Sequence, residues 1–444
     1  MNKFSRIGFI LAAAGSAVGL GNIWRFPYIT GEYGGGAFIL VYLLAILFIG
    51  LTVFLAEAVI GQNGQSDVST SFVSLSKTKS ETWKFAGFMV ATGLIILSFY
   101  SVVLGWILDY VFTSFGALPT EAKVAGANFE KLISDDVGSL IVYHTLIAAT
   151  VIFIVLKGIK EGIEKINLIL MPLLGLILIG LLIYAISLDS FSQAVSFMFT
   201  PDFSKIDSSA LLAALGQAFF TLSLGVGTIL TYSASLPKEA NFVKSSIMVA
   251  IVDTSIALIA GLIIFSFLFA AGAPSAAGPG LVFISLPVIF SGWGILGQVI
   301  AISFFVALVF AGITSAVSMI EPSLRFFIER YKITRAKATL ICGGTFYILG
   351  IIALLSMSKS FGADLTFFGK NAFDIMDFMS SSIMMPIAAI IICIFLGYFV
   401  DKSVLQEKFL AHTNATIFNI WYFLIRYLVP IAIIILFLNK LGVV

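Results

Sequence analysis

The amino-acid sequence predicts an all-α, polytopic membrane protein from its composition and from the length of its apolar runs. Of the 444 residues, 60% are hydrophobic and only 11% are charged, and the mean hydropathy is +1.10. Soluble domains carry roughly 25% charged residues, so this chain lacks the side chains that cover a water-exposed surface. A run of about 18 or more apolar residues is long enough to cross a bilayer as a helix, and the chain contains many such runs.

About eleven runs meet this length and are predicted to form the spanning helices. The predicted spans are residues 7–33, 37–62, 85–115, 139–157, 166–188, 209–236, 242–272, 294–328, 338–357, 376–400 and 417–438.

The positive charges predict the orientation of these spans. If the N-terminus is cytoplasmic, the inner segments carry most of the 25 Lys and Arg, including the cluster from Arg325 to Lys337. Lys and Arg accumulate in cytoplasmic loops. We therefore predict a multi-pass protein of the plasma (inner) membrane with a cytoplasmic N-terminus and, after eleven spans, with Val444 outside. The net charge of +2 does not point to nucleic acid.

The first span is interrupted by a glycine-rich segment, GSAVGLGNIWRFP, at residues 15–27. A glycine costs about 1 kcal/mol relative to alanine within a helix, so Gly15, Gly19 and Gly21, followed by Asn22, weaken the helix inside the span. Irregular backbone at membrane depth is tolerated only where protein or a water-filled cavity satisfies its polar groups, and those groups then bind ions and solutes. The alternative is a kink with a packing face of small residues.

The sixth span contains a similar interruption, FFTLSLGVG, at residues 219–227, with Gly225 and Gly227 beside two hydroxyl residues. Because five spans is an odd number, a second set of five begins from the opposite face. We therefore predict a 5+5 inverted repeat with spans one and six unwound at the midplane; two unrelated kinks are the alternative. The predicted units are residues 1–190 (first repeat), 191–400 (second repeat) and 401–444 (one additional span).

Asp253 is a predicted cation ligand inside the seventh span, since no other charged residue occurs between it and Glu321. A charge at bilayer depth costs roughly 2.5 to 3.5 kcal/mol, so a counter-ion or a proton is expected. Asn22, Thr221 and Asp253 offer oxygen ligands from spans one, six and seven, and hard cations prefer such ligands. The alternative is an aspartate that is hydrogen-bonded to helix ends.

Span eight suggests a second cation site, because four small or hydroxyl residues share one helix face. Its hydroxyls are predicted to join the carbonyls freed around Gly15 and Val18. Ser and Thr in membrane helices also bond back to their own backbone, which is the alternative. The four residues are Ala311, Thr314, Ser315 and Ser318.

Two further features lie in spans two and five. Glu57 is an intramembrane carboxylate, and we predict that it holds the freed N–H groups of the broken spans rather than taking part in chemistry.

In span five, Pro172 follows Gly162 by ten residues, a pair that weakens the helix near its predicted cytoplasmic end. This segment either unwinds to admit water or forms a static kink.

These motifs resemble those of the neurotransmitter:sodium symporters over residues 4–438. The resemblance rests on GSAVGLGNIWRFPY, GGGAF at residues 34–38, GQAFFTLSLGVG and FAGITS. It implies the fold of that family, the LeuT fold, with the inverted repeat described above. It also implies two bound sodium ions. The first would be held by the Ala17 carbonyl, Asn22, Thr221, Asp253 and the substrate carboxylate, and the second by the carbonyls of Gly15, Val18 and Ala311 with the hydroxyls of Thr314 and Ser315.

The resemblance further implies an amino-acid substrate. Monoamine carriers of the family have an aspartate where this chain has Gly19, and Gly19 leaves room for a carboxylate instead. Val226 replaces a larger aromatic ring, which predicts a pocket for bulky aliphatic or aromatic side chains. The implied substrate residues are Ala17, Leu20, Gly21, Ile96, Tyr100, Phe220, Thr221, Ser223, Val226, Ser318 and Met319.

The implied outer gate pairs Arg25 with Asp377, above Phe220 and Tyr100. At the inner gate Glu329 is the implied acidic partner. The family's N-terminal arginine and tryptophan are missing, and Lys3 occupies the place of the tryptophan. The uncharged stretch 272–292 is predicted to form a lid over the outer vestibule.

Two other departures concern chloride and the twelfth helix. Animal members bind chloride partly through a serine at the position of Ala257, whereas here the nearby Asp253 replaces the usual asparagine. A fixed carboxylate supplies the negative charge that chloride supplies elsewhere, so we predict chloride independence. The family's twelfth helix is missing, so the resemblance does not indicate an oligomeric state.

The resulting hypothesis is a sodium-coupled symporter that imports a neutral, hydrophobic or aromatic amino acid by alternating access. The expected partners are the amino acid and membrane lipid, with no nucleic acid. A channel needs rings of carbonyls or charges, and no repeated filter sequence is present. An enzyme is not expected, because His144 and His412 are the only histidines and no nucleophile or metal constellation forms. The alternatives are a non-transporting amino-acid sensor and a proton-coupled amino-acid carrier.

Overall fold

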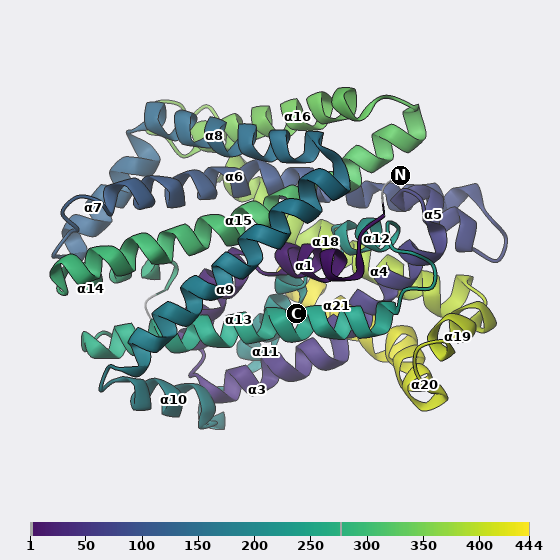
Figure 1. Ribbon diagram of the computed structural model, residues 1–444, viewed down its shortest axis with the longest axis horizontal. Helices are drawn as coiled ribbons and strands as arrows, with labels where there is room; N and C mark the ends of the chain where they lie inside the picture. The colour runs from purple at the N-terminus through teal and green to yellow at the C-terminus, as the bar shows by residue number, and fades with distance from the viewer. Residues whose placement is uncertain (1–2, 276–277, 444) are drawn as a thin grey trace.

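The computed structural model describes residues 3–275 and 278–443 as a bundle of helices that mostly follow one long axis (Figure 1). Within these residues, nine helices are long and apolar enough to cross a membrane, and the bent pair Arg6–Ala17 and Gly21–Glu32 adds a tenth. The predicted all-α membrane fold is confirmed. The predicted sixth span is divided into two helices that are each too short to cross alone, so the count of eleven remains a prediction.

The elements of the first 190 residues are α1 (Arg6–Ala17), η1 (Gly21–Arg25), α2 (Phe26–Glu32), α3 (Gly36–Ala45), η2 (Ile46–Gly50), α4 (Leu51–Gly64), α5 (Val68–Leu75), η3 (Glu81–Phe88), α6 (Met89–Thr113), α7 (Ala122–Ser134), α8 (Val137–Leu156), η4 (Ile159–Glu164) and α9 (Lys165–Ile186).

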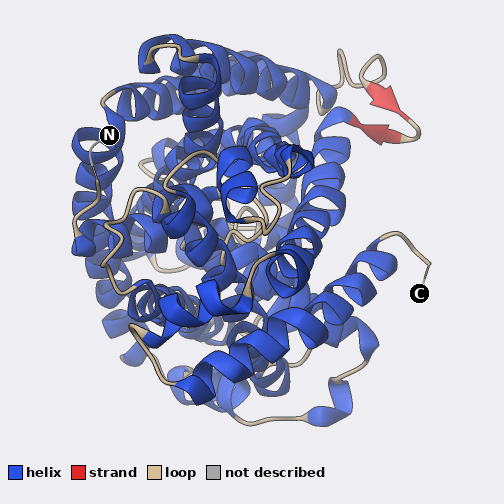
Figure 2. Ribbon diagram, turned by 90° about the vertical axis from the view of Figure 1, so that its right-hand side faces the viewer, coloured by secondary structure: helices blue, strands red, loops and turns tan. Residues whose placement is uncertain are grey.

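The remaining elements are α10 (Phe191–Phe199), η5 (Phe203–Lys205), α11 (Ser208–Thr221), α12 (Thr228–Ser233), α13 (Phe242–Ala270), η6 (Pro279–Leu281), α14 (Ser285–Ser291), α15 (Gly294–Tyr331), α16 (Arg335–Ser356), β1 (Thr366–Phe367), β2 (Lys370–Asn371), α17 (Ala372–Asp377), η7 (Phe378–Met384), α18 (Met385–Ile394), η8 (Phe395–Phe399), α19 (Lys402–Leu410), α20 (Ala415–Phe423), η9 (Leu424–Leu428) and α21 (Val429–Lys440). The two strands form an antiparallel hairpin that projects from the bundle (Figure 2).

The predicted spans agree with the helices to within a few residues, except at the start of the fifth span. The predicted start is residue 166, whereas the helix begins with the π-helical segment η4 at Ile159. Its charged residues Lys160, Glu161 and Glu164 kept it out of the apolar run. In the structure Lys160 and Glu161 are exposed and Glu164 is buried, so apolar character alone does not mark where this helix begins.

Two helices are interrupted inside the bundle. The helix α1 ends at Ala17, Val18 is extended, and the chain continues into η1 and α2 with a bend of 50°. The helix α11 ends at Thr221 and α12 begins at Thr228. Between them Gly225 and Gly227 have positive φ angles of 78° and 79°, which glycine adopts without a steric penalty. Both predicted weak points therefore coincide with breaks in the helices.

Polar and apolar side chains are distributed as expected for a protein in a bilayer. Asn22, Glu57 and Asp253 are fully buried inside the bundle. Large apolar residues on the outside of α9, such as Leu176 and Ile183, are 64% and 63% exposed. Large contiguous apolar patches are rare on the surfaces of soluble proteins. This outer surface is therefore suited to contact with lipid. The short helix α1 lies at the centre, against α9, α13 and α15 (Figure 1).

Candidate functional site

The two helix breaks lie side by side, and side chains form hydrogen bonds with the backbone of both. The hydroxyl of Ser223, in the second break, donates to the carbonyl of Ser16 at 2.9 Å. The carboxylate of Glu57 on α4 accepts from the backbone N–H of Gly225 at 2.7 Å. The predicted role of Glu57 is confirmed for the second break, where it satisfies a donor that the break frees.

Asp253 on α13 lies at the first predicted cation site, where its carboxylate accepts hydrogen bonds from two elements. The Asn22 amide donates to Oδ1 at 2.7 Å and to the backbone carbonyl of Asp253 at 3.0 Å. The Thr221 hydroxyl is 3.0 Å from each carboxylate oxygen. The Asn22 oxygen accepts from the Gly19 N–H at 3.0 Å. Side chains from two other helical elements thus converge on one buried carboxylate of α13.

Ser315 on α15 lies at the second predicted cation site. Its hydroxyl is 3.1 Å from the carbonyls of Gly15 and Val18 and 3.3 Å from that of Ser16. The hydroxyl of Thr314 donates to the Ala311 carbonyl at 2.9 Å. The carbonyls freed by the break in α1 are therefore gathered around one hydroxyl group, which supplies a single proton for several acceptors.

A small cavity lies beside the two helix breaks, and most of the predicted substrate residues line it. Its volume is about 30 Å³, which is room for about two water molecules. The predicted residues Thr221 and Ser318 do not line it; they contact Asp253 and the Ser16 hydroxyl instead. The cavity is lined by Ser16, Ala17, Gly19, Leu20, Gly21, Ile96, Tyr100, Phe220, Ser223, Val226, Ser315, Met319 and Met385.

Gly19 and Tyr100 shape the polar end of this cavity. A Cβ atom on Gly19 would lie 2.7 Å from the Ser315 hydroxyl oxygen and 3.0 Å from the Tyr100 hydroxyl oxygen. An aspartate at position 19 therefore does not fit unless these side chains move. The Leu20 N–H points at the Tyr100 hydroxyl at 3.5 Å. Leu20, with this N–H group, and Tyr100, with its phenol, both line the cavity.

The predicted outer-gate residues share a larger cavity of about 370 Å³ above the small one. Among the described residues, no ion pair joins Arg25 to Asp377; Arg25 instead donates to Gln217 at 3.0 Å and lies 5.0 Å from the centre of the Phe220 ring. The pairing predicted from the sequence is therefore not formed in this structure. Lys440, from the end of α21, also lines this cavity.

Part of the predicted lid covers the same end of the bundle. Phe283 is buried and packs edge-on against Trp24, with ring centres 5.4 Å apart. The Tyr110 hydroxyl donates to the Phe283 carbonyl at 2.8 Å. Residues 276 and 277 of the predicted lid lie outside the described residues.

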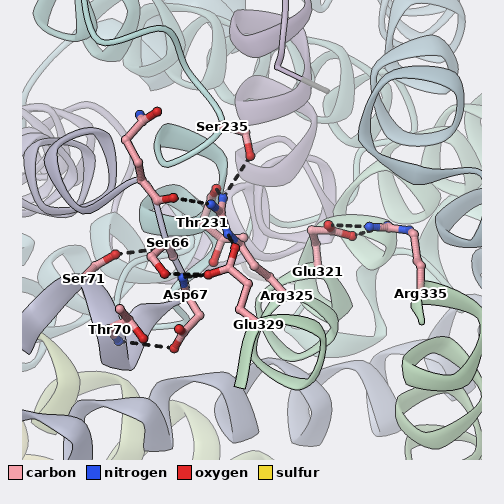
Figure 3. Close-up of polar contacts among 11 residues, drawn as sticks. Ser66, Asp67, Thr70, Ser71, Thr231, Ser235, Glu321, Arg325, Glu329 and Arg335 are labelled. Carbon is pink, nitrogen blue, oxygen red and sulfur yellow. Dashed lines mark hydrogen bonds and ion pairs between the residues drawn. The ribbon is translucent and has the colours of Figure 1, made fainter. Parts of the chain in front are cut away.

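At the opposite end of the bundle, Arg325 joins four elements or loops (Figure 3). Its guanidinium donates to the Thr231 carbonyl at 3.2 Å, the Ser235 hydroxyl at 3.0 Å and the Gln65 carbonyl at 2.9 Å. It also pairs with Glu329 at 2.8 Å. We call these residues, together with Ser66 and Asp67, the Arg325 network.

Glu329 completes the Arg325 network, because its second oxygen accepts from the Ser66 hydroxyl and the Asp67 N–H, both at 2.6 Å. The N-terminal segment closes the same face through Phe4, which is buried, packs against Tyr232 and donates its N–H to the Ser235 carbonyl. Lys3, at the position of the family's tryptophan, is exposed, and the buried aromatic residue is Phe4, one position later.

Sequence reasoning missed several of these residues. Met385 lines the cavity from α18, and Lys440 enters from the last helix, although neither belongs to a recognisable motif. Arg325 was counted only as a loop-facing positive charge, yet it is 3% exposed. Its spacing of four residues from Glu329 was the available signal, since such pairs meet on a helix.

Comparisons with known proteins agree with this geometry. A profile of the sodium:neurotransmitter symporter family matches residues 2–130 and 125–444. The chain is 37% identical to the uncharacterised sodium-dependent transporter YhdH of Bacillus subtilis, over 99% of this chain and 97% of that protein. It is 33% identical to an uncharacterised sodium-dependent transporter of Methanocaldococcus jannaschii, over 87% of this chain and 79% of that protein.

A solved structure is similar over the whole fold. The crystal structure of MhsT in complex with L-phenylalanine superposes with a TM-score of 0.88 at 41% identity, covering 99% of this chain and 100% of that one. Fold and site together define a multi-pass membrane transporter with a LeuT fold, not an enzyme. The chain belongs to the sodium:neurotransmitter symporter family, and it is a sodium-dependent symporter.

Proposed function

We propose that this protein imports a neutral, hydrophobic or aromatic amino acid together with two sodium ions, without chloride, by alternating access. The observation that carries the proposal is the pair of buried oxygen clusters at the helix breaks, where residues of both breaks also line one cavity. The similarity to a protein solved with L-phenylalanine supports the substrate class.

The first sodium ion would bind at Asp253, with Asn22, Thr221 and the Ala17 carbonyl. In the structure the Asn22 amide N–H faces the carboxylate. Turning this amide would direct its oxygen to the ion, so that sodium replaces the amide as the positive partner of Asp253. The substrate carboxylate would complete the shell, which couples amino-acid binding to sodium binding.

The second sodium ion would bind among the carbonyls of Gly15, Val18 and Ala311 and the hydroxyls of Thr314 and Ser315. The Ser315 hydroxyl oxygen lies 3.1 Å from both the Gly15 and the Val18 carbonyl oxygens. A cation bound there would turn the hydroxyl proton toward another acceptor and use the hydroxyl oxygen as a ligand. Each ion would thus be bound by residues of more than one helix: α1, η1, α11 and α13 for the first ion, and α1 and α15 for the second.

The amino acid would place its carboxylate against the N–H groups at Leu20 and Gly21 and the Tyr100 hydroxyl. These N–H groups lie at the N-terminal end of η1, and the N-terminal end of a helix is a favourable position for an anion. The side chain would lie among Ile96, Phe220 and the other apolar residues that line the cavity. Because the cavity is small in this structure, a large side chain enters only when flexible residues such as Met319 change rotamer.

We predict that Val226→Phe shifts preference toward small substrates. Val226 is buried, and a Cβ on the neighbouring Gly93 would be 3.2 Å from it, so an added ring has only the cavity to occupy. Competition binding should show phenylalanine affinity falling roughly tenfold while valine changes less than about threefold. Val299→Phe, at an exposed position on α15, is the control. Equal losses for both amino acids would contradict the placement of the side chain.

The proposed orientation places the Arg325 network on the cytoplasmic side. It places the larger cavity, which Arg25 and Asp377 line, on the outside, consistent with the distribution of Lys and Arg. Alternating access would close the outer cavity over the substrate, with Arg25 approaching Asp377, and then release the Arg325 network. Residues 1–190 and 191–400 would act as the two inverted repeats, with 401–444 as an additional span.

The ion gradients supply enough free energy for this transport. Roughly 100 mV contributes about 2.3 kcal/mol per charge, and an assumed gradient of about tenfold adds about 1.4 kcal/mol. Two sodium ions would therefore support roughly 10⁵-fold accumulation of a neutral solute.

The testing experiment is binding of pooled radiolabelled amino acids to purified protein, in sodium or potassium and with or without chloride, followed by uptake into proteoliposomes. Sodium-dependent, chloride-indifferent binding with saturable uptake is the expected result. Binding without uptake would indicate a sensor, and uptake driven by protons in potassium would indicate a proton-coupled carrier; either result overturns the proposal.

A further inference from the structure

We propose that Glu164 and Asn167 form a transient cation site, here called the relay site, that receives sodium leaving the second sodium site toward the N-terminal face. The inference rests on the proposed function, since it assumes that sodium binds beside Gly15 and Thr314. It is carried by two buried oxygen atoms that lack partners and lie against the same side of α1.

Asn167 on α9 lies directly beside the second sodium site. The residue is fully buried, its amide group donates to the Ile163 carbonyl at 2.8 Å, and its oxygen has no hydrogen-bond partner. A Cβ atom built on Gly15 would lie 2.0 Å from this oxygen and 3.0 Å from the Cβ of Thr314. The Asn167 oxygen therefore contacts the segment whose carbonyl belongs to the proposed sodium site.

Glu164 lies one helical turn from Asn167 and faces the same neighbour. Its side chain is 4% exposed; Oε1 accepts from the Ser5 hydroxyl at 2.5 Å, and Oε2 has no partner. A Cβ on Gly8 would lie 2.1 Å from Oε1, so the carboxylate rests against the backbone of α1. No ion pair involves Glu164 among residues 3–275 and 278–443.

These groups form a series of oxygens along one side of α1. Gly15 and Gly8 are seven residues apart, about two turns of helix, and Asn167 and Glu164 lie against them from α9 and η4. The series begins at the buried Thr314 and ends at Glu164, which is hydrogen-bonded to the exposed Ser5. A cation that moved along it would exchange carbonyl and hydroxyl ligands for an amide oxygen and then a carboxylate.

The chemistry of the relay site suits sodium. Carboxylate and amide oxygens are ligands for hard cations, and a buried carboxylate without a counter-ion is costly. Few ligands also mean weak binding, and a pathway requires ions to leave each site readily. The relay site would therefore lower the free energy of the departing ion without trapping it.

The element that carries Glu164 has the local weakness that such a step needs. The segment η4 is π-helical and follows Gly158, which has a φ of 89°, and π-helical segments are frequent at functional sites. Gly162 within η4 borders a surface cavity of about 290 Å³. Loosening of η4 would bring water toward Glu164 as the ion arrives.

The test compares Glu164→Gln with Glu161→Gln in proteoliposomes. Glu161 belongs to the same segment but is exposed, so it controls for the loss of a charge near this face. In Glu164→Gln we expect net sodium-driven uptake to fall about tenfold. Amino-acid exchange with sodium on both sides, and the sodium concentration for half-maximal binding, should stay within about twofold of wild type, because neither requires net release of the ion. Glu161→Gln should match wild type in all three assays.

Two further variants test whether Glu164 binds the departing ion or only anchors the N-terminal segment through Ser5. Ser5→Ala removes the hydrogen-bond donor but keeps the carboxylate, so net uptake should stay near the wild-type rate. Asn167→Leu keeps the volume but removes the oxygen, so it should reproduce the Glu164→Gln pattern. If Ser5→Ala loses net uptake as Glu164→Gln does, the carboxylate only anchors the N-terminal segment and the relay is overturned.

The remaining outcomes are also decisive. Normal net uptake in both Glu164→Gln and Asn167→Leu would overturn the relay while leaving the proposed function intact. Sodium-independent binding by the wild-type protein would overturn the proposed function and the relay with it. Equal losses of exchange and net uptake in Glu164→Gln would show a general defect and would also overturn the relay.

Discussion

Asp253→Asn is expected to eliminate most sodium-driven uptake. The asparagine keeps the shape of the site, because its carbonyl still accepts from Asn22 and its amide reaches the Thr221 hydroxyl, both within 3.0 Å of the native carboxylate. What is lost is the negative charge that would hold sodium. Because the site is buried, that charge is poorly screened, and we expect the sodium concentration for half-maximal uptake to rise at least about tenfold.

Chloride makes this prediction more specific. If the Asp253 carboxylate supplies the negative charge that chloride supplies elsewhere, uptake by Asp253→Ala, which opens space beside Ala257, should gain a dependence on chloride. The measurement is uptake at fixed sodium with chloride or gluconate. Asp109→Asn, which neutralises a carboxylate on α6 away from the cavity, should behave as wild type. Full sodium-driven uptake in Asp253→Ala without chloride would contradict the proposed sodium site.

Arg325→Ala is expected to open the face that carries the Arg325 network. Arg325 is 3% exposed and donates to acceptors on or near α4 and α12 as well as to Glu329. Removal of one partner from a buried ion pair costs about 3 to 5 kcal/mol, and several carbonyl and hydroxyl acceptors lose their donor as well. The conformation closed at this face should therefore lose population.

Labelling of a reporter cysteine measures this opening. Thr231→Cys places a thiol on α12 behind the Arg325 network and leaves the Thr231 backbone carbonyl in place, and the native Cys342 and Cys393 are buried. A polar thiol reagent should label the reporter at least about tenfold faster in Arg325→Ala, and amino-acid accumulation should fall. Arg330→Ala, at an exposed position of the same helix, should leave labelling unchanged. Unchanged labelling in Arg325→Ala would show that the network does not close this face.

The sequence alone predicted features that depend on local chemistry. Runs of apolar residues defined the helices, because each polar group placed in lipid adds its own free-energy cost, which can be read from the sequence one residue at a time. Glycine clusters at residues 15–21 and 225–227 indicated the two breaks, because backbone freedom is a property of the residue itself. Asp253 was visible as an isolated charge between long apolar runs.

The tertiary structure decided which distant residues meet. Arg325 binds Glu329 on its own helix, but its other acceptors come from Gln65, Thr231 and Ser235. Whether Arg25 pairs with Asp377 depends on how far apart the helices lie, and in this structure Arg25 binds Gln217. The unpartnered oxygens of Glu164 and Asn167 are recognisable only because α1 lies against them. Composition and helix periodicity are local properties, whereas contacts between helices depend on the packing of the whole bundle, which no single segment encodes.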